Sequence, residues 1–295
     1  ITPFGFIKAD DIEFEIVDTP NIQNVYMEDE IPKGSLNLIK FDSETKKILK
    51  GAKFSYKNKT TGEVIEELVT DESGKAEAKK EVPIGYLGND GYFKPYTYEV
   101  VEIDAPDDYM LNTLPHEFIY EYKDENTVSL TYSYDALNDI NQVKISKIDL
   151  TSKKELEGAK LKVYEKATKK LVDEWVSTKE VHYIKGLKEG KYILEEIATP
   201  EHGNYAKAKN IEFEIVKNMT CIPFVEMFDD SSKVEIKKVD GSTGLNLEGA
   251  KLSLKDENGK VLYEWVSSKE NYQISGLKAG NYYISEVEAP KGYEK

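Results

Sequence analysis

The sequence predicts an all-β protein built from tandem β-sandwich modules with about seven strands each. Three observations lead to this prediction. Residues that favour strands are abundant, with 20 tyrosines among 295 residues and many Val, Ile and Thr. Short segments of alternating polar and apolar residues are separated by turns rich in Gly, Asn and Pro. Long stretches of sequence also recur along the chain, which indicates a modular array.

These internal repeats divide the chain into modules of roughly a hundred residues. Residues 143–200 and 234–290 align over long stretches, because both contain the segments LEGAK and EWVS in register. A more divergent copy begins near residue 35, and the segment IEFEIV occurs at both 12–17 and 211–216. We therefore predict four parts: 1–32, the final strands of an incomplete module; 33–140, a β-sandwich with an insertion near 83–95; 141–230, a second β-sandwich; and 231–295, a third that lacks its final strands.

Composition disfavours several classes of function. The chain has a formal net charge of −15, a pI near 4.9 and no arginine, so neither nucleic acid nor an anionic membrane is an expected partner. No segment approaches the ~20 apolar residues that a membrane-spanning helix needs. The single cysteine, Cys221, cannot form an internal disulfide, and the three histidines lack metal-binding spacing. We therefore expect no cofactor and no metal. Because disulfides cannot stabilise the modules, we expect another source of stability.

A lysine continues the apolar positions of the first strand in each copy. Side chains alternate between the two faces of a strand, so residues two apart share a face. Val143 and Ile145 therefore share a face with Lys147. The same relation holds for Lys40 and Lys238 in the other copies. We predict that these three lysines point into the cores of their modules.

Acidic residues occupy inward positions of two later strands. Glu196 lies in phase with the apolar residues that precede it, as do Glu102 and Glu286 in the matching strands. In the last strand, the pattern V-x-M-x-D puts Asp229 on the apolar face, and the same pattern ends at Asp29 near the start of the chain. Each module is thus predicted to bury one amine and two carboxyl groups.

Buried charges of this kind must be paired or neutral, because an isolated buried ion costs several kcal/mol. Desolvation lowers the pKa of a lysine and raises that of a carboxyl group, which drives both toward uncharged forms. An uncharged amine is a nucleophile, and a protonated aspartate side chain can be acylated. A neighbouring glutamate can move protons and polarise the carbonyl group. The predicted product is an amide between the two side chains, formed with loss of water.

The combined pattern resembles a known family. The residues that carry the resemblance are [VIL]-x-K-x-D, a following GAK, then Y-x-[LIV]-x-E before an Ala/Thr-Pro turn, and finally V-x-M-x-D. This arrangement is similar to the collagen-adhesin B-type, or SpaA-type, prealbumin-like modules of Gram-positive surface proteins and pilins. It covers essentially the whole chain and implies Ig-like, prealbumin-like sandwiches. In that family the lysine bonds to an Asn or Asp of the last strand, and the glutamate catalyses the reaction.

By position, the resemblance implies a bond between Lys147 and Asp229, with Glu196 as the catalyst. Lys238 and Glu286 have no acceptor in their own stretch of sequence, and Asp29 of a neighbouring copy occupies the matching position.

The 33–140 module departs from the family pattern at its last strand. Lys40 and Glu102 match the nucleophile and the catalyst. The apolar alternation of 128–134 leaves Asp135 out of phase, whereas Asn138 is in phase but lies later in the strand than the family pattern places its acceptor. A β-bulge would bring either of the two inward. The acceptor is therefore open between Asp135 and Asn138, and so is the existence of a bond in this module.

Three classes of function compete. A glycoside hydrolase needs two acids across an open cleft, whereas these acids lie in phase with core residues. An adhesin, in which the 33–140 module binds a host or surface ligand, would present an exposed aromatic patch around Tyr86, Tyr92, Phe93 and Tyr96. We predict a structural stalk or fibre segment with self-made cross-links rather than an enzyme that acts on external substrates. The adhesin is the alternative.

The predicted location is the bacterial cell surface, either in the cell wall or in a surface fibre. The predicted partners are neighbouring modules or further copies of the same protein. Strand addition between residues 1–30 of one copy and residues 231–295 of the next is one way in which copies would join.

Overall fold

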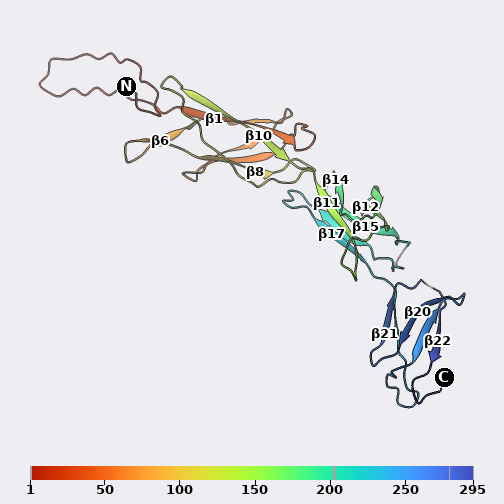
Figure 1. Ribbon diagram of the computed structural model, residues 1–295. Helices are drawn as coiled ribbons and strands as arrows, with labels where there is room; N and C mark the ends of the chain where they lie inside the picture. Colours follow the sequence, from red (N-terminus) through yellow and green to blue (C-terminus); the bar gives the residue numbers. More distant parts are fainter. Residues whose placement is uncertain (1, 202–203, 279, 295) are drawn as a thin grey trace. The chain divides into compact units, whose positions relative to one another are not determined.

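The computed structural model describes residues 2–201, 204–278 and 280–294. The chain is all-β and consists of β-sandwich modules in series, as predicted (Figure 1). Its residues form two compact units. One comprises Ile1–Gln142, Lys185–Glu189 and Ile215–Ile222, and the other comprises Val143–Ile184, Gly190–Glu214 and Pro223–Lys295. Within the described residues, no helix is long and apolar enough to cross a membrane.

The first unit contains a sandwich of two four-stranded sheets. In one sheet, β1 lies between β10 on one side and β4 and β5 on the other; the strands are β1 (Lys33–Asp42), β4 (Lys75–Glu77), β5 (Val82–Pro83) and β10 (Ser129–Asn138). The other sheet has the order β3-β2-β8-β9; its strands are β2 (Lys53–Asn58), β3 (Val64–Val69), β8 (Tyr98–Asp104) and β9 (His116–Phe118).

Alternation of side chains builds the core of this sandwich. Leu36, Leu38 and Lys40 point inward from β1 and are fully buried. They face Phe54 and Tyr98 of the opposite sheet. The strands β1 and β10 are parallel neighbours. The first and last strands of the module therefore run side by side, although nearly a hundred residues separate them in sequence.

The insertion near 83–95 forms a short hairpin. Its strands are β6 (Gly85–Leu87) and β7 (Phe93–Pro95). Residues near the start of the chain pack onto it, because the ring of Phe4 lies 5.9 Å from that of Phe93. Gly5 adopts a φ of +93°, and a Cβ atom there would lie 2.2 Å from the Phe93 ring. Only glycine fits this close approach.

The second unit contains a sandwich with the same plan. One sheet has the order β14-β11-β17 and the other β13-β12-β15-β16. The strands are β11 (Gln142–Asp149), β12 (Lys160–Glu165), β13 (Leu171–Val176), β14 (His182–Lys185), β15 (Gly190–Ala198), β16 (Ile211–Ile215) and β17 (Phe224–Asp229). Its first and last strands are again parallel neighbours, with Lys147 opposite Met227 and Asp149 opposite Asp229.

The remaining strands of the second unit form two smaller sheets. One pairs β18 (Lys233–Ile236) with β21 (Tyr272–Ser275). The other has the order β20-β19-β22 and consists of β19 (Lys251–Lys255), β20 (Val261–Val266) and β22 (Tyr283–Glu288). Across the residues that the structure describes, β18 and β22 each have one neighbour only.

The strands predicted at 12–17 and 25–30 do not form in the described chain. Between residues 2 and 32, the pairing is an isolated bridge between Ile7 and Glu30. The apolar side chains of this segment, among them Phe14, Ile16 and Met27, are exposed. The physical reason is the lack of a neighbouring sheet: without a partner strand, the backbone groups of an extended segment stay hydrated rather than joining a ladder.

Candidate functional site

The 141–230 module buries three ionisable side chains at one point of its core. Lys147 Nζ donates a hydrogen bond to Asp229 Oδ1 and lies 3.1 Å from Glu196 Oε1. The side chain of Lys147 is 1% exposed, and those of Glu196 and Asp229 are 0% exposed. The structure therefore brings together the three residues that the repeat pattern selected.

Three strands position these groups. Lys147 and Asp229 approach each other because β11 and β17 are parallel neighbours and both side chains point into the sandwich. Glu196 reaches the same point from β15 in the opposite sheet. Its Oε2 atom accepts a hydrogen bond of 2.7 Å from the backbone N–H of Ala208, which fixes the direction of the carboxyl group.

Burial sets the protonation of Asp229. Loss of water on burial raises the pKa of its carboxyl group, Lys147 opposes this shift and Glu196 adds to it, so that the net pKa is about 7 instead of the ordinary value near 4. Asp229 Oδ2 is buried and has no hydrogen-bond partner among the described residues. A substantial fraction of Asp229 is therefore neutral near pH 7, which is the form that an amine can attack.

The 33–140 module contains a matching site with an amide in place of the acid. Lys40 Nζ donates a 2.5 Å hydrogen bond to Asn138 Oδ1 and lies 3.1 Å from Glu102 Oε1. Asn138 Nδ2 donates a 2.9 Å hydrogen bond to the same Glu102 oxygen. The other oxygen, Oε2, accepts the N–H of Asn112 at 2.8 Å. The three side chains thus form a closed, fully buried network.

Of the two acceptors left open by the sequence, Asn138 contacts the lysine. The strand β10 continues without a bulge as far as Asn138, and its alternation turns Asn138 inward and leaves Asp135 exposed. The late position of Asn138 follows from the length of the strand, which pairs with β1 up to Asp42. Asp135 takes no part in the site.

Desolvation also acts on the ionisable pair in this module. Burial lowers the pKa of Lys40, and the attraction of Glu102 only partly offsets this effect. Burial likewise raises the pKa of Glu102 against the influence of Lys40. Both groups move toward their neutral forms, so that the nucleophilic form of the amine is more populated than in water.

The 231–295 module contains a lysine–glutamate pair that is more exposed to solvent. Lys238 Nζ donates a 3.2 Å hydrogen bond to Glu286 Oε2. The two side chains are 28% and 18% exposed, in contrast to the buried triad of the preceding module. Asp29, the predicted acceptor, lies exposed in the other unit and accepts a 3.2 Å hydrogen bond from Ala9 N–H. Because Asp29 and Lys238 belong to different units, a bond between them stays a prediction.

Sequence reasoning missed one recurring contact beside these sites. The aspartate two residues after each lysine accepts a hydrogen bond from a tyrosine hydroxyl; the pairs are Asp42–Tyr109, Asp149–Tyr205 and Asp240–Tyr293. The signal was present in the K-x-D pattern of each copy and in a tyrosine that follows each Ala/Thr-Pro turn. This contact ties the end of the first strand to the segment that covers the site.

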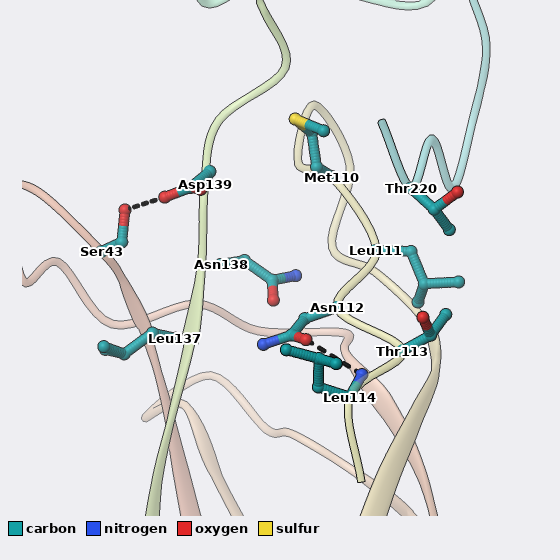
Figure 2. A pocket seen from close by; sticks show the side chains of 10 residues that line it. All are labelled: Ser43, Met110, Leu111, Asn112, Thr113, Leu114, Leu137, Asn138, Asp139 and Thr220. Carbon is teal, nitrogen blue, oxygen red and sulfur yellow. Dashed lines mark hydrogen bonds between the residues drawn. The ribbon is translucent and has the colours of Figure 1, made fainter. Parts of the chain in front are cut away.

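A pocket of about 600 Å³ lies against the site of the first unit. Figure 2 shows Asn138 pointing from β10 toward the segment 110–114, while Leu137 points to the other side of the strand. The buried acceptor amide is therefore one of the residues that line this pocket. In the described part of the chain, no group of three or more His, Cys, Asp or Glu is placed to hold a metal ion.

The aromatic residues of the insertion do not form the continuous exposed patch that an adhesin would require. Tyr86 stacks on Tyr96 with ring centres 4.9 Å apart. Phe93 packs against Phe4 and Tyr122. Tyr92 alone among the four predicted residues is largely exposed. These rings mainly pack the hairpin onto the sandwich.

Several solved structures are similar to the chain. Solved structures similar to it include the Bacillus anthracis TIE protein, with 26% identity and a TM-score of 0.41 over 89% of this chain and 47% of that one. The Streptococcal ancillary pilin shows 17% identity and a TM-score of 0.31 over 90% and 92% of the two chains. The shaft pilin SpaA from Lactobacillus rhamnosus GG shows 14% identity and a TM-score of 0.30 over 68% and 98%.

The chain thus spans about half the length of the Bacillus anthracis protein. A search of curated proteins finds no match. The model of the SpaA prealbumin-like fold domain, however, matches residues 34–134, 141–229 and 232–295. Together with the repeated sandwiches and their inward lysines, this match shows that the chain belongs to the SpaA prealbumin-like domain family.

Proposed function

We propose that this chain is a structural segment of a bacterial surface stalk or fibre, whose modules form their own internal amide cross-links. The observation that carries the proposal is the buried contact of Lys147, Glu196 and Asp229. An amine and two carboxyl groups in a core are costly to keep as ions. Their condensation removes two of the three ionisable groups and leaves a neutral amide in their place.

The bond in the 141–230 module forms by direct condensation. The neutral amine of Lys147 attacks Cγ of protonated Asp229, and Glu196 takes a proton from the nitrogen and delivers it to the departing hydroxyl group. A Lys–Asp amide and one molecule of water result. No oxidant or further reactant is consumed, and Glu196 returns to its starting state.

The bond in the 33–140 module releases ammonia instead of water. Lys40 attacks Cγ of Asn138, while Glu102 moves the proton from Lys40 Nζ to Asn138 Nδ2, with which it already shares a hydrogen bond. The products are a Lys–Asn amide and ammonia. The pocket beside Asn138 offers ammonia a path to solvent.

Both bonds join the first strand of a module to its last strand. This role requires one reaction per site and no turnover, because each lysine is consumed, so the chain is not an enzyme for external substrates. The cross-links also supply what disulfides supply in other secreted proteins, in a chain that has one cysteine. Location at the bacterial cell surface belongs to the same proposal.

Intact mass spectrometry tests the proposal. The wild-type chain should be lighter than its sequence mass by one water and one ammonia. Glu196→Gln should restore the mass of the water only, because the ammonia is lost in the other module. Glu195→Gln is the matched control, since Glu195 pairs with Lys162 at 3.2 Å outside the buried triad. A wild-type chain with its full sequence mass would overturn the proposal.

A further inference from the structure

One short segment contacts all three reactive strands in the 33–140 module and again in the 141–230 module. It comprises residues 109–112 in the first and residues 205–208 in the second, and we call it the strap. In each module the strap follows the Ala/Thr-Pro turn after the strand that carries the glutamate of the site. Both straps make the same three contacts, although their sequences, YMLN and YAKA, share only the tyrosine.

The first contact holds the strap to the strand of the lysine. The hydroxyl of Tyr109 donates a 2.9 Å hydrogen bond to Asp42, and that of Tyr205 donates a 2.5 Å hydrogen bond to Asp149. Burial raises the pKa of both tyrosines to about 12, so each hydroxyl keeps its proton at neutral pH and remains a donor. Each aspartate lies two residues after its lysine, and this contact therefore fixes the strap relative to the nucleophile.

The residue before each tyrosine has a left-handed backbone conformation. Asp108 has a φ of +69° and Asn204 a φ of +49°. Gly292, which precedes the tyrosine of the third Asp–Tyr pair, has a φ of +91°. Asp, Asn and Gly are the residues that adopt this conformation most readily. The chain therefore turns at the same point in each copy, immediately before the tyrosine that reaches the aspartate.

Two backbone N–H groups of the strap make the other contacts. N–H groups of alternate residues in an extended segment point to the same side. Met110 N–H donates a 2.9 Å hydrogen bond to the carbonyl group of Asp139, the residue directly after the acceptor Asn138. Two residues later, Asn112 N–H donates a 2.8 Å hydrogen bond to Glu102 Oε2.

The 141–230 module repeats both contacts at the same spacing from its tyrosine. Ala206 N–H donates to the carbonyl group of Asp230 at 3.0 Å, and Asp230 directly follows the acceptor Asp229. Ala208 N–H donates to Glu196 Oε2 at 2.7 Å. Each strap thus joins the strand of the nucleophile, the end of the acceptor strand and the glutamate itself.

The third contact decides which glutamate oxygen faces the lysine. Because the strap N–H occupies Oε2, the other oxygen, Oε1, lies 3.1 Å from the lysine Nζ both in Glu102–Lys40 and in Glu196–Lys147. The N–H also favours the ionised carboxyl group. Burial raises the pKa of Glu102, whereas the charge of Lys40 and the hydrogen bond from Asn112 oppose that rise. The ionised form is the one that takes a proton from the lysine nitrogen.

We propose that Tyr109 and Tyr205 are positioning residues for cross-link formation, each of which holds its strap so that a strap N–H aims the glutamate at the lysine. This inference rests on the proposed function, because it concerns the rate of the same two bonds. The hydroxyl groups donate to the turn aspartates rather than to a reacting group, and they act through the strap. Their loss should slow bond formation without changing the product.

The rate of bond formation in freshly made chains tests the proposal. The full chain is made in a short cell-free pulse and quenched in acidic guanidinium at increasing times. Mass spectrometry follows the loss of water in the 141–230 module and the loss of ammonia in the 33–140 module, while protease resistance times the folding of each module. Tyr205→Phe should slow the loss of water about 5- to 10-fold, as expected for one hydrogen bond, with the folding time and the loss of ammonia unchanged. Tyr109→Phe should do the reverse.

Three further variants separate positioning from stability. Phe213→Ala is the control for lost stability, because Phe213 stacks on Tyr192 with ring centres 5.5 Å apart and lies outside the strap and the triad. An ester oxygen in place of the Ala208 N–H should slow the loss of water about 10-fold or more, since this N–H contacts a carboxylate. Asp149→Asn should retain the wild-type rate, because its Nδ2 group can donate to the Tyr205 oxygen, whereas Asp149→Ala should react as slowly as Tyr205→Phe.

The pH dependence of the ammonia loss gives a readout that stability alone does not change. Glu102 faces Lys40 and the N–H of Asn112, and its charge also acts on the phenol of Tyr134. Weaker donation from Asn112 raises the pKa of Glu102, so in Tyr109→Phe the acid limb of the rate profile should move to higher pH. Lower stability of the module would reduce the rate without moving this limb, and an unmoved limb would contradict the proposal.

The outcomes separate this inference from the proposed function. If the wild-type chain keeps its full sequence mass, the proposed function is wrong and the strap has no bond to accelerate. If the wild type forms both bonds and the two tyrosine variants form them equally fast, the positioning role is wrong and the proposed function stands. If Phe213→Ala delays the bond as much as Tyr205→Phe, lost stability is the cause, and the positioning role is again wrong.

Discussion

At the scale of single residues, burial decides which of several similar side chains can react. Asp229 and Asp29 end the same V-x-M-x-D pattern. Asp229 is fully buried beside an amine, and its pKa is raised to about 7, while Asp29 lies in water. The side chain of Lys147 is 1% exposed, and that of Lys238 is 28% exposed. The proposed bond therefore requires both the residue type and its enclosure in the core.

The acceptor in the 33–140 module gives a first prediction. Asn138→Asp should still cross-link, but with loss of water instead of ammonia. The cross-linked product is then identical to that of the wild type, and its mass is one water below the variant's own sequence mass. Asn138→Ala should abolish the bond, because no other acceptor contacts Lys40. Asp135→Ala is the control, since Asp135 points outward. Intact mass distinguishes the three, and loss of the bond in Asp135→Ala would contradict this assignment.

The raised pKa of Asp229 predicts how the uncross-linked module depends on pH. Glu196→Gln should leave Lys147 and Asp229 unjoined while retaining the burial that dominates the shift. A carboxyl group with a folded-state pKa of about 7 and an unfolded one of ~3.9 binds more protons in the folded state between these values. Its contribution to stability is full below pH ~4 and is lost as pH rises to about 7.

Chemical denaturation of Glu196→Gln should therefore show a free energy of unfolding for this module that falls between about pH 4 and about pH 7. The double variant Glu196→Gln/Asp229→Asn has the same shape but no titrating acid at this position. Its stability should lack this dependence, and an equal fall in both variants would show that another group is responsible.

At the scale of elements, the turn after each first strand is held by the aspartate of the K-x-D pattern. Asp149 Oδ1 accepts the backbone N–H groups of Thr151 and Ser152, and Oδ2 accepts the hydroxyl of Tyr205. These hydrogen bonds, the one from Ser152 above all, lower the pKa of Asp149. The lysine and the turn aspartate sit two residues apart and point to the same face, so the turn fixes the strand end that carries the nucleophile.

Removal of this aspartate should weaken the module. Asp149→Ala, made in the Glu196→Gln background, should lower the free energy of unfolding by about 1–2 kcal/mol through loss of the turn hydrogen bonds. Tyr205→Phe should cost about 1 kcal/mol, because it removes the hydroxyl contact alone. Glu226→Ala on the exposed face of β17 is the control and should stay within about 0.5 kcal/mol. Denaturant titration measures all three changes.

The strands also show which predictions from the sequence hold and which one does not. Alternation predicted the inward faces of β1, β11, β15 and β17 correctly, because period-two patterning and burial coincide in a sandwich. The same pattern at 12–17 predicted a strand that does not form in the described chain. A strand exists only with a neighbour, and IEFEIV has one at 211–216, where β16 pairs with β15, but none at 12–17.

At the scale of the whole molecule, parallel pairing of the first and last strands defines a route for tension. Force that enters at Lys33 runs along β1 to Lys40, and the proposed bond passes it to Asn138 at the end of β10. The residues between them carry no load. The second bond encloses a loop of 82 residues, which corresponds to about 4 to 5 kcal/mol of chain-entropy stabilisation.

Single-molecule pulling should reveal this route. In the wild-type chain, the 33–140 and 141–230 modules should not lengthen under force, because the covalent path is closed. Glu102→Gln should add an unfolding step that releases the 98-residue separation between Lys40 and Asn138, at about 3.3–3.6 Å per residue. Glu99→Gln on the same strand is the control. A wild-type module that extends by the full length would contradict the role in carrying load.

The sequence by itself determined the all-β class, the repeats, and the inward phase of the lysines and glutamates, because all of these depend on local alternation and on comparison of one segment with another. Tertiary structure decided which acceptor meets which lysine. Asn138 rather than Asp135 faces Lys40, because β10 pairs with β1 over its whole length without a bulge. Local alternation cannot make this choice, because contact between residues distant in sequence depends on which strands become neighbours, and that follows from the packing of whole sheets.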